Sequence, residues 1–275
     1  MAGGGLANDA ERRRWNDPRW VNQWTTREQM TDLVTPVLLD SLAPERGERV
    51  LDVGCGGGKT SLAAAAAVGP DGLVVGADLS AHRAELARRR GEEAGLRNAR
   101  FHVADVQTAN VDGGPFDAAM SQFGVMFFDE PVTAFRNIGA HLRPGGRMAF
   151  ACWQSPKSNP WFIGPALAGI LPPPPPPEPG KGSTGPFSLA DPEVVRSILE
   201  EAGFEAVEAV GHERVLEVSE DFVVDDAQMA FLGVPDEAME AARSAIATHL
   251  APLRIEEGRL RFSLAFQVVT ARRSN

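Results

Sequence analysis

Short apolar runs alternate with longer amphipathic stretches between residues 49 and 153. The runs have the length of buried strands, and the stretches between them have helical spacing. Strands separated by helices form right-handed βαβ crossovers, so the pattern predicts an α/β fold with a doubly wound, mostly parallel sheet. The five strands are predicted at 49–53, 73–78, 100–105, 116–123 and 147–153.

The pattern changes after residue 153. Six consecutive prolines at 172–177 predict an extended connector. Beyond them we expect a helix at 191–203, an alternating strand at 205–218, a helical stretch at 225–250 and a final strand at 259–273. The two late strands extend the predicted sheet to seven, with an antiparallel strand near the end. The expected architecture is a Rossmann-like seven-stranded sheet with an N-terminal helical cap and a late helical insertion.

Three segments follow from this pattern. Residues 1–14 are small and charged and are predicted to be a disordered N-terminus, whereas 15–45 are predicted to form the helical cap. Residues 46–275 make up the main domain. Within that domain, the loop 154–190 and the helical excursion 218–258 are expected to cover the ligand site, because such covers are often additions to a core.

The formal net charge of −10 over 275 residues argues against broad attraction to nucleic acid or to anionic membranes. Cys55 and Cys152 are too few for a disulfide scaffold or a cysteine-rich metal site. No apolar run approaches the roughly 20 residues of a membrane span, and the first residues lack the apolar centre of a secretory signal. A cytoplasmic protein without nucleic-acid or membrane partners is therefore expected.

A glycine-rich loop follows the first predicted strand in the stretch VLDVGCGGGKTSL, residues 50–62. A phosphate-binding Walker A loop would need glycine where Val53 stands. A dinucleotide fingerprint would need a third glycine where Lys59 or Ser61 stands. The stretch instead fits Asp-x-Gly-x-Gly-x-Gly, which begins at Asp52.

This pattern resembles the class I S-adenosylmethionine-dependent methyltransferases, and the resemblance covers about 49–153. It implies that Asp78, which closes the second strand, binds both ribose hydroxyls and that Asp105, which closes the third, contacts the adenine amine. The ribose role also agrees with the spacing of Asp78 from the glycines. The implied cofactor is S-adenosyl-L-methionine, which leaves as S-adenosyl-L-homocysteine. The candidate cofactor-binding residues are Asp52, Gly54, Cys55, Gly56, Gly58, Asp78, Leu79, Asp105, Val106, Ser121, Gln122 and Phe123.

The segments SQFGVMFFDEP (121–131), NPWF (159–162) and GPFSLADP (185–192) resemble a broad group of bacterial small-molecule methyltransferases akin to the ubiquinone/menaquinone type. An apolar acceptor pocket is consistent with this resemblance. Ordinary core packing explains each of its candidate residues equally well. These candidates are Trp20, Trp24, Met126, Phe127, Phe128, Trp153 and Trp161.

The sequence names no general base. His212 is the one candidate, although a structural or surface position is favoured for it. No carboxylate closes the fourth strand and the histidines lack metal-ligand spacing, so no metal is expected.

The predicted function is transfer of a methyl group to a small organic acceptor by in-line displacement. Two alternatives stay open, namely an enzyme that uses bound S-adenosylmethionine without methylation and a non-catalytic binding module. Monomer and homodimer are both compatible with the sequence.

Overall fold

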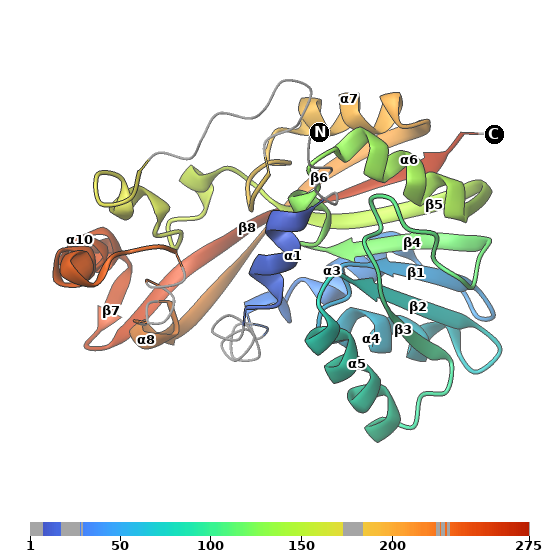
Figure 1. The fold of residues 1–275 in the computed structure, drawn as a ribbon, viewed down its shortest axis with the longest axis horizontal. Coiled ribbons are helices and arrows are strands. Elements are labelled where there is room, and N and C mark those ends of the chain that lie inside the picture. Colours follow the sequence, from blue (N-terminus) through green and yellow to red (C-terminus); the bar gives the residue numbers. More distant parts are fainter. Residues whose placement is uncertain are drawn as a thin grey trace, which may run out of the picture.

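The computed structural model describes residues 8–17, 28, 30–172, 184–223, 226, 229 and 232–274, and within them eight strands form one sheet (Figure 1). The strand order is β3-β2-β1-β4-β5-β8-β6, and β7 pairs with β8. The strands are β1 Arg49–Val53, β2 Leu73–Asp78, β3 Ala99–Val103, β4 Phe116–Gln122, β5 Leu142–Trp153, β6 Phe204–Ser219, β7 Arg254–Glu256 and β8 Arg259–Arg273.

Strands β1 to β5 are paired in parallel, and β8 runs antiparallel to both β5 and β6. The prediction of a seven-stranded, mostly parallel sheet with a late antiparallel strand is thus confirmed. The three-residue strand β7 adds an eighth that the sequence pattern did not predict. Because the parallel strands share one direction, the loops after β1, β2, β3 and β4 meet at one edge of the sheet.

Helices cover both faces of the sheet, as two side chains of β5 demonstrate. Arg147 donates from Nε to the carbonyl of Leu42 at the end of α3, and Phe150 packs against Phe135 of α6. Positions three apart on a strand face opposite sides, so α3 and α6 lie on opposite faces. The α-helices discussed below are α1 Asp9–Trp15, α3 Thr35–Leu42, α4 Lys59–Val68, α5 Ala81–Glu93, α6 Pro131–His141, α7 Pro192–Glu201, α8 Glu220–Val223 and α10 Met239–Leu250.

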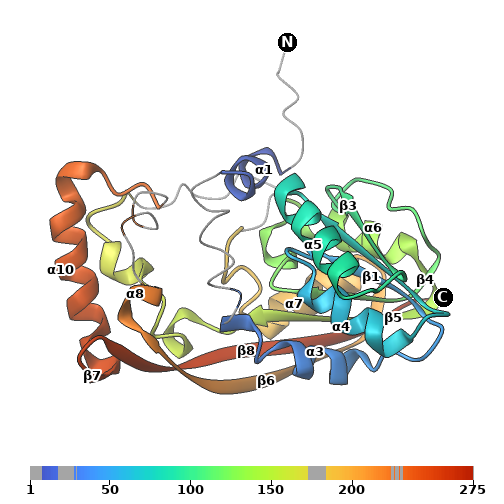
Figure 2. The ribbon, with the colours of Figure 1, turned by 90° about the horizontal axis from the view of Figure 1, so that it is seen from below.

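The strands β6 and β8 have 16 and 15 residues, against 12 in β5 and 5 to 7 in β1 to β4, and they pair over almost their whole length. Figure 2 shows this pair continuing past the core toward α8, β7 and α10. The helix α10 packs there against a short 3-10 turn at Gly164–Leu167. The predicted excursion 218–258 therefore stands at the far end of a two-stranded ribbon. Part of it, like Pro173 to Pro177 of the proline run, lies outside the described residues.

The N-terminal prediction was wrong for residues 9–14. These residues belong to the helix α1, whereas the sequence predicted disorder; residues 1–7 lie outside the described part. A seven-residue charged helix has little stability of its own, so the contacts that order it are tertiary. Those contacts involve the strand ends described next. The candidates Trp20 and Trp24 also lie outside the described residues.

Candidate active site

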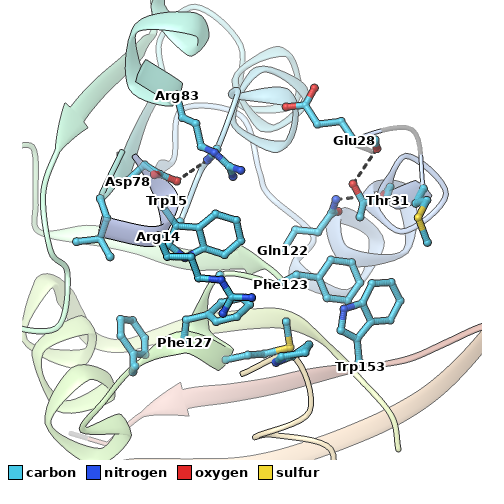
Figure 3. Close-up of a pocket in the computed structure, with 18 of the residues that line it drawn as sticks. Arg14, Trp15, Glu28, Thr31, Asp78, Arg83, Gln122, Phe123, Phe127 and Trp153 are labelled. Carbon is cyan, nitrogen blue, oxygen red and sulfur yellow. Dashed lines mark hydrogen bonds between the residues drawn. The ribbon is translucent and has the colours of Figure 1, made fainter. Parts of the chain in front are cut away.

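A cavity of about 600 Å³ opens where the carboxyl ends of β1, β2 and β4 meet (Figure 3). Its volume lies in the range of small-molecule sites. One end is formed by the glycine loop and the ends of β2 and β3, and we call it the polar half. The other end is formed by aromatic and aliphatic side chains that follow β4 and β5, and we call it the apolar half.

The loop between β1 and α4 brings backbone to the wall of the polar half. Gly54 has φ of +68°, and a Cβ there would come within 2.9 Å of the Cα of Gly124. Gly56 has φ of +53°, and a Cβ there would meet no atom closer than a 3.8 Å contact with Arg83. Glycine is required at Gly54 for space and backbone conformation together. At Gly56 it leaves the backbone open to a ligand.

Asp78 lies at the end of β2, where only 8% of its surface is exposed. Its Oδ2 accepts a hydrogen bond from the backbone N–H of Gly56 at 2.9 Å, and Oδ1 accepts one from Ser80 at 2.8 Å. A carboxylate has about four acceptor positions, so each oxygen keeps capacity for a ligand hydroxyl. The two backbone bonds fix the direction of that capacity.

Asp105 follows β3 and also lines the cavity. Its Oδ1 accepts from the side-chain amide of Asn8 at 2.9 Å and from the backbone N–H of Gln107 at 3.0 Å. Leu79 and Val106, which directly follow the two acidic residues, line the same half. The acidic ends of β2 and β3 therefore meet around one space, as the sequence predicted.

Asp52, Gly58 and Ser121 lie behind the wall and are not among the residues that line the cavity. Asp52 is fully buried, where its Oδ2 accepts from the hydroxyls of Thr60 at 2.7 Å and Ser61 at 2.5 Å. Burial raises the pKa of Asp52 to about 6. This geometry differs from direct contact with a cofactor: Asp52 ties the start of α4 to β1.

The other two residues brace the same loop. Gly58 has φ of +83°, and a Cβ there would come within 2.8 Å of the Cβ of Ala87 on α5. Ser121 donates its hydroxyl to the carbonyl of Val53 at 2.7 Å and accepts from Gly124 N–H at 3.2 Å. They support the wall from behind.

The end of β4 joins the two halves. The amide of Gln122 accepts from the Thr35 hydroxyl and donates to the carbonyl of Thr31, which fixes the segment before α3 against the strand. Phe123 has the left-handed φ of +60°, so the chain turns there and its ring stacks on Trp153 at 3.9 Å between centroids. A positive φ at a non-glycine residue is strained and is often found at functional sites.

The apolar half combines residues from distant parts of the sequence. Trp153 meets Trp161 edge to face at 5.1 Å, and Trp161 is held by a hydrogen bond from its indole N–H to Asn159. All predicted acceptor-side candidates in the described residues line the cavity. Its apolar lining comprises Met126, Phe127, Phe128, Trp153, Trp161, Phe162, Ile163, Leu167, Leu171, Phe222, Val223 and Leu232.

The helix α1 lies beside the carboxyl ends of the parallel strands (Figure 1), and its Arg14 and Trp15 line the cavity. Asn8 at its start reaches Asp105, and Asn16 at its end donates to the carbonyl of Leu79 at 3.3 Å. The Trp15 ring meets Phe127 edge to face at 5.2 Å, and the guanidinium of Arg83 lies 4.6 Å from its centroid. Figure 3 shows Trp15 and Arg14 in front of the cavity.

The sequence prediction missed several lining residues before the first strand and on α5, namely Asn8, Arg14, Trp15, Glu28, Met30, Thr31 and Arg83. The available signal was a tryptophan directly after a charged run, ERRRW at 11–15. A seven-residue helix is too short for a reliable hydrophobic period, so the sequence did not indicate which face of this helix is buried.

His212 is not one of the cavity-lining residues. Its ring stacks on Phe266 at 5.4 Å, and partial burial lowers its pKa. His212 is therefore a packing residue on β6, which agrees with the structural or surface position that the sequence favoured.

Cys55 lines the cavity, and burial raises the pKa of its thiol well above the usual range. A thiol that stays protonated is a poor nucleophile. Cys55 is therefore a packing residue of the wall.

No group of three or more His, Cys, Asp or Glu side chains in the described ranges is arranged to hold a metal ion. None of the helices in the described part is both long and apolar enough to cross a bilayer.

Residues 50–146 match a family model described as a methyltransferase domain. The chain is 36% identical to the aklanonic acid methyltransferase DauC of a Streptomyces species over 135 residues, which cover 49% of this chain and 61% of that protein. It is also 36% identical to an O-methyltransferase of Pyrenophora dematioidea over half of each chain. Over these matches the chain spans about half to three fifths of the length of its curated relatives.

The fold has solved counterparts. A SAM-dependent methyltransferase from Aquifex aeolicus superposes with a TM-score of 0.52 and 17% identity, over 97% of this chain and 99% of that one. Neither relative carries a ubiquinone or menaquinone name, so that narrower resemblance stays a prediction. The sheet order and the glycine loop beside two acidic strand ends are both consistent with the matched methyltransferase domain. Residues 50–146 therefore match a methyltransferase domain, within a fold that resembles a solved SAM-dependent methyltransferase.

Proposed function

We propose that this protein transfers a methyl group from S-adenosyl-L-methionine to a small organic acceptor. The observation that carries the proposal is the division of one cavity into two halves. Asp78 and Asp105 flank exposed glycine backbone in the polar half, whereas the apolar half has the lining of a site for an uncharged ring system. A cofactor and an acceptor placed in these two halves would meet beside Phe123.

The polar half suits a cationic nucleoside. The carboxylate of Asp78 can accept from two ribose hydroxyls, and Asp105 can accept from an adenine amino group. The open side of Gly56 gives space for the methionine portion to approach the backbone. Asp52 and Asp78 add negative charge near the site, and this favours a sulfonium while opposing a pyrophosphate. When bound, S-adenosylmethionine supplies an activated methyl group on a cationic sulfur.

The side chains of this protein then have two tasks. They hold the acceptor atom in line with the methyl carbon at about 3–3.5 Å, and they exclude water from the site. The helix α1 and the aromatic residues after β5 supply the cover. Leu79, Val106 and Gln122 complete the proposed cofactor contacts, and Met126, Phe127, Phe128, Trp153 and Trp161 the proposed acceptor contacts.

Isothermal titration of S-adenosylmethionine and S-adenosylhomocysteine tests the site. Asp78→Ala should weaken both by at least about 100-fold, because two hydrogen bonds to a charged group are lost from a buried position. Asp71→Ala removes the same charge at an exposed turn residue and should leave the affinity unchanged. Equal affinity in the two variants would remove the basis for this site.

A product assay distinguishes methyl transfer from the other uses of the cofactor. One equivalent of S-adenosylhomocysteine should form for each methylated product. Turnover without its release would instead support a non-methylating enzyme, and failure of the wild type to bind either compound would support a binding module of another kind.

A further inference from the structure

The two halves of the cavity differ in where their charges lie. Apart from Cys55, every described lining residue with an ionisable side chain belongs to the N-terminal segment, the start of α4, α5 or a strand end. These residues are Arg14, Glu28, Lys59, Asp78, Arg83 and Asp105. The described lining after residue 125 is apolar throughout. An acceptor in the apolar half therefore meets aromatic and aliphatic side chains without a charge.

Arg14 brings one positive charge to the border of that half. Its guanidinium carbon lies 5.9 Å from the ring centroid of Phe127 and 5.8 Å from that of Trp15. Figure 3 shows the side chain extending toward Phe127. Its Nη1 also lies 3.6 Å from Glu11, and a third of the side chain remains exposed. Arg14 thus lines the cavity with its guanidinium beside two aromatic rings.

We propose that the acceptor is a flat aromatic acid whose carboxylate, or an equally acidic phenolate, is held by Arg14. The rings of Phe123, Trp153 and Trp161 would take the aromatic body, since offset and edge-to-face ring contacts favour a flat π system. A guanidinium matches the planar oxygens of a carboxylate better than any other side chain does. This inference rests on the proposed function and names the substrate class of that same site.

The reaction then balances without a protein base. The acid loses its proton to solvent before it binds. One anionic oxygen attacks the methyl carbon, an oxygen–carbon bond forms, and the sulfur–carbon bond breaks with its electron pair left on sulfur. A cation and an anion become the neutral ester or ether and the neutral thioether of S-adenosylhomocysteine. The apolar lining favours this step because charge disappears along it.

Calorimetry with 2-naphthoic acid and 2-naphthalenemethanol tests the proposal, with S-adenosylhomocysteine present throughout. The two probes share a flat ring system and differ in the anionic group. The wild type should bind the acid at least about tenfold more tightly than the alcohol. Arg14→Gln should remove this preference and leave the alcohol within about twofold of its wild-type affinity, whereas Arg14→Lys should restore part of it.

Arg13→Gln is the matched control, because Arg13 lies on the same helix, carries the same charge and is 76% exposed. It should keep the wild-type preference. The proposal is overturned if the wild type binds the two probes equally or binds neither, or if Arg14→Gln weakens both probes to the same extent. The last result would mean that Arg14 only keeps α1 in place.

A third titration separates the acceptor from the cofactor as the source of the carboxylate. If Arg14→Gln weakens S-adenosylhomocysteine alone by more than about tenfold and leaves the probe preference intact, the anion belongs to the cofactor and the proposal fails. A wild type that does not bind S-adenosylhomocysteine would contradict the proposed function itself. Tight S-adenosylhomocysteine binding without a carboxylate preference contradicts only this inference.

Discussion

The polar and apolar halves of the cavity are built by different means. The polar half uses backbone groups and short acidic side chains at the ends of β1, β2 and β3, and two backbone N–H groups fix Asp78. The apolar half uses bulky side chains from β5, from the segment after it and from the far end of the β6–β8 ribbon. The first depends on local loop geometry, and the second depends on how distant segments pack.

This difference predicts a separation of tasks. Changes in the glycine loop should affect cofactor binding, and changes in the aromatic cluster should affect the acceptor. Phe123 is the exception, because it turns the chain after β4 and also stacks on Trp153. The helix α1 is a second link, since Asn8 reaches the polar half and Trp15 reaches Phe127.

Gly54→Ala should have the largest effect. The added Cβ would lie 2.9 Å from the Cα of Gly124, and an alanine would also have to keep the φ of +68° that Gly54 has. We expect a loss of about 4 kcal/mol in unfolding free energy and at least a 100-fold loss of S-adenosylhomocysteine affinity, measured by urea denaturation and calorimetry. Gly95→Ala has almost the same φ, +67°, with no atom within 4 Å. Gly95→Ala should cost about 1 kcal/mol of unfolding free energy and leave the S-adenosylhomocysteine affinity intact. Similar affinities in both variants would contradict the view that the loop at Gly54 has no space for a side chain.

Trp153→Ala tests whether the halves are separable. It removes a side chain that is 7% exposed and stacked on Phe123. We expect about 3 kcal/mol of destabilisation and loss of 2-naphthoate binding, with S-adenosylhomocysteine affinity within about threefold of wild type. Trp153→Phe keeps an aromatic ring and should retain most of both properties. If Trp153→Ala abolishes cofactor binding in a protein that is still folded, the halves are one unit.

The pKa of Asp52 predicts how the support of the polar half responds to pH. Burial raises this pKa to about 6, above the ordinary 3.8 of an unfolded chain. Between these values the native state binds more protons than the unfolded state, so stability falls as pH rises. From pH 4 to pH 7 the wild type should lose about 2 kcal/mol of unfolding free energy relative to Asp52→Asn. Urea titrations at the two pH values measure it, and parallel curves for the two proteins would show that Asp52 does not titrate in this range.

Asn8→Ala should have the smallest effect. It removes a hydrogen bond to Asp105 and one from the backbone of Asp129. The docking of α1 should weaken by about 1 kcal/mol, seen as about fivefold faster hydrogen exchange at residues 10–15. Asp9→Ala breaks only an exposed 3.7 Å ion pair with Arg13 and should change exchange much less. Equal exchange in Asn8→Ala and wild type would mean that other contacts hold the helix.

The regular part of the fold could be predicted from local pattern. Apolar runs gave β1 to β5 within a few residues, except that β5 begins at Leu142 and not at Arg147. The acidic residues that end β2 and β3 could also be found, because parallel strands bring their ends together whatever the details of packing. The direction in which the Asp52 side chain points could not be predicted from the sequence. Whether a carboxylate at the end of β1 faces the ligand or the start of α4 depends on hydroxyls eight and nine residues later.

The amino-acid sequence by itself determined the α/β architecture and the sheet edge at which the cavity opens. These depend on short-range features, namely strand periodicity, glycine conformation and the residue type at a strand end. Only the tertiary structure decided that 9–15 form a helix over the cavity, that Phe123 stacks on Trp153, and that Arg14 stands beside Phe127. Those arrangements join residues far apart in sequence, and their energy comes from burial and ring contacts that no local pattern encodes.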